Sequence, residues 1–164
     1  FAEAEKAIQD KIDRLMAIKG ERSVDSIHKE LGLVMWDFVG MGRTAEGLKE
    51  GIAKIDAIKN EFWSNVYIPG EADKLNNELE KALRLADFIE IGRLMAVDAL
   101  HREESCGGHF REEFQTPEGE AMRQDDKFSY VGCWMYTGED SEPELIKEPL
   151  DYEFTERKTR NYKN

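Results

Sequence analysis

Apolar residues recur every three or four positions through the first two thirds of the chain. This spacing places them on one face of a helix. It predicts four helices, over about residues 3–18, 23–39, 44–62 and 72–102. Ser23 and Thr44 are suited to begin helices, and Gly40–Arg43 and Pro69-Gly70 are suited to interrupt them. The apolar stripes are Ile8, Ile12, Leu15 and Met16; Leu31, Val34, Met35 and Phe38; Leu48, Ile52, Ile55, Ile58 and Phe62; and Leu75, Leu79, Leu83, Ala86, Ile89, Leu94 and Val97.

The pattern changes after Gly107-Gly108, where period-two alternation replaces the helical period. Aromatic residues and Gly132 alternate with other side chains and predict a strand over about 128–137. A second strand is expected over about 145–150, after a turn at Gly138-Glu139-Asp140. The sequence therefore predicts a mainly α fold: a helical bundle over 1–106 and an irregular tail over 107–164.

Composition narrows the function classes. The chain has 164 residues, 40% of them hydrophobic and 35% charged, and 23 basic against 35 acidic residues give a net charge of −12. An acidic surface disfavours nucleic acid and anionic membranes as partners, and no apolar run is long enough to cross a bilayer. The two cysteines, Cys106 and Cys133, are too few for a disulfide scaffold, which indicates a reducing compartment. A start at Phe1, already in a helical pattern, indicates a fragment of a longer protein.

Signals for catalysis and metal binding are weak. The sequence contains no Gly-rich phosphate motif, nucleophile elbow or metalloprotease helix signature. Its acidic pairs fit solvated helix faces, as Glu80 does with Arg84 four residues later. His101, Cys106 and His109 are spaced H-x4-C-x2-H, which is not a standard zinc pattern, and no second pair follows. We therefore expect no metal site in the chain.

The densest polar segment runs from residue 102 to residue 114, next to the end of the predicted long helix. Two readings fit its charges, histidine and glycines. One is a docking or active-site rim element, and the other is an intramolecular ion-pair network that holds the tail to the bundle. Arg102 and Arg111 are expected to pair with carboxylates such as Glu104 or Glu112.

Two groups of aromatic residues lie near predicted helix ends. Trp36 with Phe38, and Phe62-Trp63 near Tyr67, are expected to cap the core. The alternative is an exposed aromatic patch that binds a partner.

The segment from Ala99 to Phe114, ALHREESCGGHFREEF, resembles the signature A-L-x-R-x-E-S-R-G-A-H-x-R-x-D-F/Y. That signature belongs to the C-terminal region of succinate dehydrogenase and fumarate reductase flavoprotein subunits. The resemblance continues through Asp125-Asp126 and includes the earlier stretch 35–48, which is similar to the family's M-x-D-x-V-G-x-x-R-x-x-x-x-L junction. Leu85–Ala99 resembles the long helix that leads into the signature.

Departures from the family pattern suggest a subgroup. Cys106 stands where the family usually has Arg, Gly108 stands where it has Ala, and Glu112-Glu113 replace a common Asp. These variants resemble the menaquinone-dependent branch in anaerobic bacteria. Without the Arg, a forked donor is lost from the signature.

The resemblance implies a spectrin-repeat-like bundle of three principal helices, with a shorter N-terminal helix and an extended tail holding a strand or hairpin. The chain would be the C-terminal part of a flavoprotein that interconverts succinate and fumarate through FAD. The family's residues for FAD and substrate precede this region, so the fragment alone is expected to bind no cofactor and to be inactive. The residues expected to hold the chain to neighbouring domains or subunits, called the contact staple, are Arg102, Glu104, Ser105, His109 and Arg111.

The implied partners are the remainder of the flavoprotein chain, an iron–sulfur subunit and a membrane anchor, with no nucleic acid and no direct membrane insertion. The implied location is cytoplasmic, on the inner face of the bacterial cytoplasmic membrane. Two alternatives remain. One is the related C-terminal domain of L-aspartate oxidase or of the adenylylsulfate reductase flavoprotein. The other is a free-standing acidic helical adaptor with Trp36, Phe62 or Trp63 as its anchor.

Overall fold

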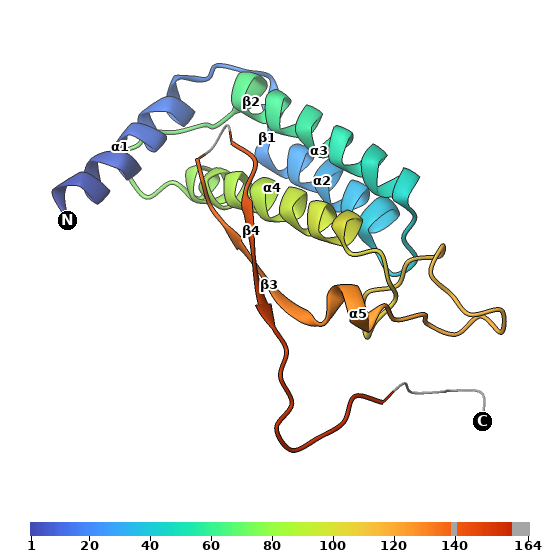
Figure 1. Cartoon of the computed structure of the whole chain (residues 1–164). Helices are drawn as coiled ribbons and strands as arrows, with labels where there is room; N and C mark the ends of the chain where they lie inside the picture. The colour runs from blue at the N-terminus through green and yellow to red at the C-terminus, as the bar shows by residue number, and fades with distance from the viewer. Residues whose placement is uncertain (139–140, 159–164) are drawn as a thin grey trace. The chain divides into compact units, whose positions relative to one another are not determined.

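The computed structural model describes residues 1–138 and 141–158. The chain forms two compact units, which divide between His101 and Arg102, a few residues before the predicted boundary at 106/107. The first unit is helical, as Figure 1 shows. Its elements are α1 (Ala2–Ala17), β1 (Arg22–Ser23), α2 (Val24–Val39), α3 (Ala45–Asn65), β2 (Val66–Tyr67) and α4 (Asn77–His101).

The predicted helical bundle is confirmed. Ser23 Oγ accepts a hydrogen bond from Ser26 N at 3.2 Å, and Thr44 Oγ1 accepts one from Gly47 N at 3.0 Å, so both predicted N-caps form. The N-terminal helix α1 has 16 residues, as α2 does, and is therefore shorter only than α3 and α4.

Helix α4 begins at Asn77, five positions after the predicted start near residue 72. The cause is Asn76, whose Oδ1 accepts a hydrogen bond from Leu79 N at 3.0 Å and whose Nδ2 donates to Pro69 O at 2.8 Å. This side chain caps the helix and ties the preceding loop to it. Leu75, which fits the apolar stripe by spacing, is 97% exposed and lies outside the helix.

The core of this unit lies between α2, α3 and α4. Helix α3 packs against both α2 and α4. Phe62 is the largest fully buried side chain, and its ring meets that of Trp63 edge-on at 5.0 Å. Each of the three helices presents one buried stripe. On α4 the stripe differs from the predicted one, because Ala82, Leu85, Ala96 and Ala99 are buried whereas the predicted Leu83, Leu94 and Val97 are half-buried. The buried apolar residues of these helices are Val24, Ile27, Leu31, Val34, Val39, Leu48, Ile55, Ile58, Phe62, Leu79, Ala82, Leu85, Ala86, Ile89, Ala96 and Ala99.

One prediction about the aromatic residues is wrong. Trp36 was expected to cap the core, yet its side chain is 80% exposed, whereas Phe38 and Trp63 are half-buried and Phe62 is fully buried. Trp36 lies on the outward side of α2, off the stripe of Leu31, Val34, Met35 and Phe38, and its position near the helix end was not enough to bury it.

Helix α1 is held less firmly than the others, because Leu15 is its only buried residue. The Arg14 guanidinium lies 3.9 Å from the centre of the Trp63 ring, in cation–π geometry. Lys11 Nζ lies 3.0 Å from Asp87 Oδ1 on α4.

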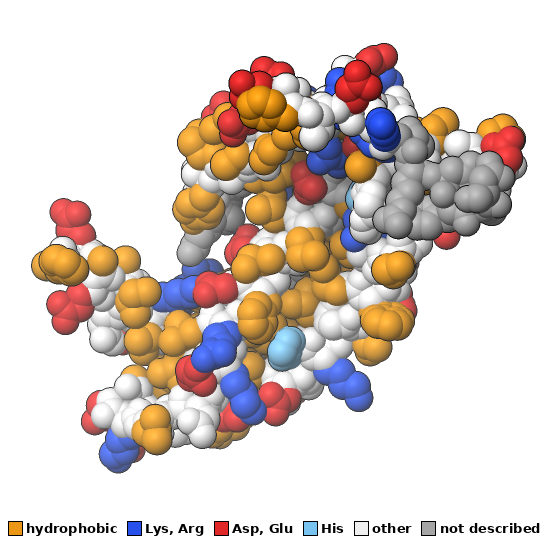
Figure 2. All heavy atoms as spheres, turned by 90° about the horizontal axis from the view of Figure 1, so that it is seen from below, with side chains coloured by type: hydrophobic (Ala, Val, Ile, Leu, Met, Phe, Trp, Pro, Cys, Tyr) orange, Lys and Arg blue, Asp and Glu red, His pale blue; other side chains and the backbone are white. Residues whose placement is uncertain are grey.

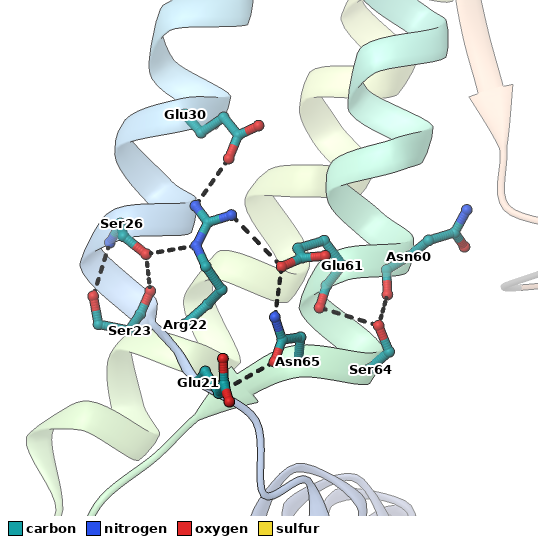
Figure 3. A network of polar contacts seen from close by, with 9 residues as sticks. All are labelled: Glu21, Arg22, Ser23, Ser26, Glu30, Asn60, Glu61, Ser64 and Asn65. Atoms are coloured by element: carbon teal, nitrogen blue, oxygen red, sulfur yellow. Dashed lines mark hydrogen bonds and ion pairs between the residues drawn. The ribbon is translucent and has the colours of Figure 1, made fainter.

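A polar network joins the start of α2 to the end of α3 (Figure 3). Arg22 Nη2 lies 2.9 Å from Glu30 Oε2 and Arg22 Nη1 lies 3.6 Å from Glu61 Oε1. Asn65 Nδ2 donates to the same Glu61 oxygen at 2.8 Å, and Asn65 Oδ1 accepts from Glu21 N at 2.9 Å. These bonds align β1 with β2, which run parallel with Arg22 opposite Val66.

The second unit holds a short helix and a hairpin. Helix α5 (Asp125–Phe128) precedes β3 (Tyr130–Met135), which pairs antiparallel with β4 (Glu144–Pro149) from Tyr130↔Pro149 to Met135↔Glu144. The strand starts two residues later than predicted, because Phe128 N donates to Gln124 O at 3.0 Å and closes α5. Glu139 and Asp140 of the predicted turn lie outside the described residues.

No helix in the described ranges 1–138 and 141–158 is long and apolar enough to cross a membrane.

Two glycines in the helical unit are expected to respond oppositely to alanine. A Cβ on Gly20 would lie 1.9 Å from the Asn65 carbonyl oxygen, whereas a Cβ on Gly32, inside α2, would meet nothing within 4 Å. Gly20→Ala should lower the free energy of unfolding by about 3 kcal/mol, because backbone must move. Gly32→Ala should raise it by about 1 kcal/mol through helix propensity. Urea unfolding measures both, and a neutral Gly20→Ala would contradict the close contact.

The Lys81 ammonium joins α4 to the start of α2. Lys81 Nζ lies 2.9 Å from Glu78 Oε1 and 3.1 Å from Asp25 Oδ1, and these two hydrogen bonds raise the pKa of Lys81 above its ordinary 10.5. A raised pKa means that folding favours the protonated form. The stabilisation is therefore complete below the ordinary pKa and is lost as the pH rises through the raised one.

We expect Lys81→Met to unfold at lower urea than the wild type at neutral pH, and this difference should vanish at pH values above the raised pKa. Lys29→Met, on the exposed side of α2, controls for general alkaline effects. A difference independent of pH would show that packing of the Lys81 stem, rather than its charge, stabilises the fold.

Candidate domain- or subunit-contact site

The segment after α4 folds back on itself within the second unit. Cys106 and His109 exchange backbone hydrogen bonds of 2.8 and 3.1 Å, which closes a tight loop over Gly107-Gly108. Gly107 has φ of 59°, a left-handed conformation that favours glycine. The stem of the loop is fixed further along, because Ser105 N donates to Met122 O at 2.9 Å.

Glu104 is one of the buried charged residues of this segment, with only 2% of its surface exposed. Its Oε1 accepts a hydrogen bond from Arg102 Nε and its Oε2 accepts one from Gln124 N, both at 2.9 Å. A buried carboxylate needs such partners, since its desolvation is costly. Glu104 therefore ties the start of the segment to the approach to α5.

Arg102 extends this connection to the hairpin. Its Nη2 donates to Phe128 O at 2.7 Å, and its guanidinium lies 5.6 Å from the centre of the Tyr130 ring. The Arg102–Glu104 pair that the sequence predicted thus forms, with further partners supplied by residues more than twenty positions away.

Ser105 and Arg111 form the second buried part of the network. Ser105 is fully buried, and its Oγ donates to Arg111 O at 3.1 Å and accepts from Arg111 N at 2.9 Å. The Arg111 residue is 2% exposed. Its Nε donates to Glu113 Oε2 at 3.2 Å, so its carboxylate partner here is Glu113 rather than the predicted Glu112, which is exposed.

His109 completes the set of five predicted staple residues. Its Nε2 lies 2.8 Å from Arg102 O. Because a carbonyl only accepts, Nε2 is the nitrogen that carries hydrogen in this contact. His101 belongs to α4 in the other unit. Among residues 1–138 and 141–158, no group of three or more His, Cys, Asp or Glu side chains is arranged to hold a metal ion.

An open hollow of about 510 Å³ lies beside the network and is lined by Thr116 and residues 121–127. Arg123 Nη2 lies 2.7 Å from Asp125 Oδ1, and this hydrogen-bonded pair raises the pKa of Arg123, which stays charged. Near it in sequence, Oε1 of Glu120 is buried without a hydrogen-bond partner among the described atoms. The hollow is polar, and Arg123, one of the two cationic side chains that line it, already pairs with a carboxylate.

The network binds the 102–114 segment to residues 122–130 of its own unit. The sequence pointed to the five predicted residues of the charge-rich segment 102–114. It gave no sign of Met122, Gln124 and Phe128, which contribute through backbone atoms. Backbone donors and acceptors carry no residue signature, so only the fold reveals them. The nearest feature noted in the sequence was the acidic pair Asp125-Asp126.

Together, the three-helix bundle and the carboxylate-centred tail define a helical domain with a hairpin-bearing C-terminal unit. The family model described as the fumarate reductase flavoprotein C-terminus matches residues 28–162. The chain belongs to this family, which confirms the resemblance drawn from the sequence.

Curated relatives agree with the family. The chain is 32% identical over 112 residues to an FAD-dependent oxidoreductase of Methanocaldococcus jannaschii, covering 68% of this chain and 20% of that protein. It is 31% identical over 104 residues to the fumarate reductase flavoprotein subunit of Proteus vulgaris, covering 63% and 17%. An L-aspartate oxidase of Yersinia pestis matches at 32% over 84 residues, covering 49% and 14%. The chain therefore spans about a fifth or less of these relatives.

Solved structures share the fold. A quinol-fumarate reductase with menaquinol molecules matches with a TM-score of 0.76 and 25% identity, over 92% of this chain and 25% of that one. The Mycobacterium smegmatis Sdh1 complex matches with a TM-score of 0.73 and 21% identity, over 92% and 25%.

Ser105→Ala should destabilise the C-terminal unit. It removes the only side chain shown bonding both the N–H and the C=O of Arg111, in a place shielded from water. The expected loss is about 2 kcal/mol of unfolding free energy, with faster hydrogen exchange at the Arg111 amide. Ser64→Ala, at an exposed helix position, should change stability by less than about 0.5 kcal/mol. Unchanged exchange at Arg111 in the Ser105 variant would contradict this role.

Proposed function

We propose that this chain is the C-terminal domain of a flavoprotein subunit whose whole enzyme interconverts succinate and fumarate. The observation that carries the proposal is the family match over residues 28–162, supported by the same fold in a quinol-fumarate reductase. The role of the domain is structural. It supports the neighbouring parts of the enzyme and contributes to contact with a partner subunit.

The chemistry belongs to the rest of the parent protein. Curated relatives are named as an FAD-dependent oxidoreductase and a flavoprotein subunit. FAD, when bound there, would accept or donate the hydride. In this chain the charged groups of the network engage one another, and the described hollow has its arginine paired with Asp125. We expect the fragment alone to bind no FAD and to show no redox activity.

The five residues predicted to form the contact site would support contact with a neighbouring domain or subunit in two ways. Glu104, Ser105 and Arg111 are buried, so they fix the shape of the segment rather than meeting a neighbour themselves. Arg102 and His109 are half-buried and brace the loop over Gly107-Gly108, whose tip is exposed. The loop tip would then be presented in one conformation to the adjoining domain or subunit, which reduces the entropic cost of docking.

The partners would be the remainder of the flavoprotein chain, an iron–sulfur subunit and a membrane anchor that passes electrons to a quinone. The solved relatives support partner subunits in general, since one is the Sdh1 complex and another is a quinol-fumarate reductase with menaquinol molecules. The parent would then lie on the cytoplasmic face of the membrane as a peripheral part of that complex.

A second activity has a specific observation in its favour. The 32% identity to an L-aspartate oxidase makes oxidation of L-aspartate the alternative for the parent enzyme. The fumarate reductase flavoprotein of Proteus vulgaris matches a longer stretch, 104 residues against 84, and the family model carries the same name. We therefore favour succinate and fumarate.

The test is purification of the tagged full-length gene product from its native host, with a visible spectrum and dye-reduction assays on succinate and L-aspartate. We expect flavin and iron–sulfur absorbance and activity with succinate. Activity with L-aspartate alone would establish the alternative, and a colourless, inactive product would contradict both.

Glu104→Gln in the full-length protein tests the staple. The amide cannot supply the negative charge that Arg102 faces, so we expect weaker co-purification of the iron–sulfur subunit and faster protease cleavage between residues 102 and 128. Glu103→Gln changes an exposed neighbour and should alter neither. Equal behaviour of the two variants would refute a contact role for the network.

A further inference from the structure

The two sides of the β3–β4 hairpin have different surroundings. Residues that pair across the ladder share a side, and neighbours along a strand alternate between the sides. On one side Tyr130 is buried, and Trp134 and Leu145 are half-buried. The centre of the Tyr130 ring lies 6.2 Å from that of Phe128 in the same unit. This inner side therefore packs against the hairpin's own unit.

The opposite side of the hairpin carries apolar residues that are exposed to solvent. Val131, Ile146 and Met135 are 51%, 46% and 42% exposed. Leu150, directly after β4, extends this side, because its N–H donates to Ser129 O at 3.0 Å and continues the ladder. We call the surface made by the residues of this side the outer hairpin face. Its members are Val131, Cys133, Met135, Glu144, Ile146, Glu148 and Leu150.

The charged residues of the two strands are divided between the sides by sign. The strands contain three of them, Glu144, Lys147 and Glu148. Lys147 lies on the inner side, where its Nζ is 4.6 Å from the centre of the Tyr130 ring, in cation–π geometry. Both carboxylates lie on the outer hairpin face, which the structure describes in full and which carries no basic side chain. The exposed side of the hairpin is therefore apolar and acidic.

The hairpin itself does not use these carboxylates. Glu144 lies opposite Met135 and Glu148 lies opposite Val131, whereas a cation opposite each would be the stabilising choice. Neither carboxylate forms an ion pair within residues 1–138 and 141–158. Along β4 and beyond it, the outer hairpin face alternates acidic and apolar residues at every second position. The two carboxylates are four residues apart, which is about 13 Å along a strand.

We propose that the outer hairpin face binds reversibly to a separate protein that presents two lysine or arginine side chains about 13 Å apart, with apolar side chains between them. Glu144 and Glu148 would receive the cations, and Ile146 would contact the apolar side chains. The net charge of −12 would attract such a basic partner from a distance. The face lies outside the segment 102–114, and its role does not depend on the substrate of the parent enzyme.

The position of the charges favours a reversible partner over a permanent one. Permanent interfaces are more hydrophobic than reversible ones, and charged residues are depleted from their centres. Glu148 lies between Ile146 and Leu150 on the outer hairpin face, so a charge interrupts the apolar area itself. A second copy of this chain would bring carboxylates toward carboxylates, which is unfavourable. Figure 2 shows acidic and hydrophobic side chains interspersed over the side of the molecule in view.

Photo-cross-linking of the tagged full-length flavoprotein tests the proposal. The photoreactive residue p-benzoylphenylalanine is introduced at Met135, on the outer hairpin face, or at Leu75, which is exposed in the helical unit. Each protein is irradiated in lysate of its native host at about 0.05 M and about 0.5 M salt, and mass spectrometry locates the adducts. We expect an adduct from Met135 with a separate protein, in a segment holding at least two lysine or arginine residues. Its yield should fall about tenfold at the higher salt, and Leu75 should not form it.

Every other result of the cross-linking overturns the proposal. An adduct with the flavoprotein's own chain would assign the outer hairpin face to an intramolecular contact, and an adduct between two copies would assign it to self-association. An adduct whose yield is the same at both salt concentrations would indicate a permanent subunit. A segment without basic residues would contradict the role of the carboxylates, and no adduct from Met135 would show that the face stays free.

A matched pair of double variants tests the two carboxylates. Glu144→Gln with Glu148→Gln removes both charges from the outer hairpin face, whereas Glu112→Gln with Glu153→Gln removes two exposed charges elsewhere in the same unit. We expect the first pair to lower the adduct yield from Met135 about fivefold, because two ion pairs with the partner are lost, and the second pair to leave it unchanged.

Hydrogen exchange at the amides of β4 shows whether the hairpin itself is affected. We expect the same exchange rates in both double variants, because neither Glu144 nor Glu148 forms an ion pair within residues 1–138 and 141–158. Faster exchange only in the Glu144 and Glu148 variant would show that these carboxylates stabilise the hairpin. That result, or equal adduct yields from the two double variants, would refute the proposal.

Discussion

A carboxylate removed from water has to be surrounded by donors, and in the C-terminal unit this requirement falls on Glu104. Its two oxygens take hydrogen bonds from Arg102 and from the backbone of Gln124, twenty positions later. The chain between these residues is thereby closed into a loop, within which Ser105 and Arg111 form their buried pair. Loss of any one partner would leave polar groups unpaired in a dry environment, so the elements of this unit depend on one another.

The helical unit is organised by a close approach of backbones rather than by charge. Gly20 lies against the carbonyl of Asn65, where no side chain fits, and this contact brings the start of α2 to the end of α3. The surrounding ion pairs of Arg22 are partly exposed and add modestly. The larger stabilisation comes from the buried stripes of α2, α3 and α4, with Phe62 and Ile55 at no exposure.

Much of this fold could be predicted from the sequence because helical period and N-caps are local signals. The start of α4 could not, since Leu75 fits the stripe by spacing and only the bonds of Asn76 exclude it from the helix. Trp36 was misplaced because it was judged by its position near a helix end, whereas the period leaves it off the buried stripe of α2. In the site, the density of charge pointed to five residues that the structure joins in one hydrogen-bonded network, whereas the backbone partners at Met122, Gln124 and Phe128 have no signature in the sequence.

The weak attachment of α1 bears on how the protein unfolds. With one buried residue, Leu15, and surface contacts from Arg14 and Lys11, this helix can detach at a smaller cost than the bundle. Its release moves Arg14 away from the Trp63 ring and so changes the emission of that indole, and it takes only Leu15 of the fully buried core residues with it. During unfolding, the loss of helical signal and the loss of core packing would then have different transition curves. Helices α2, α3 and α4 would unfold as one cooperative unit, and α1 would unfold separately.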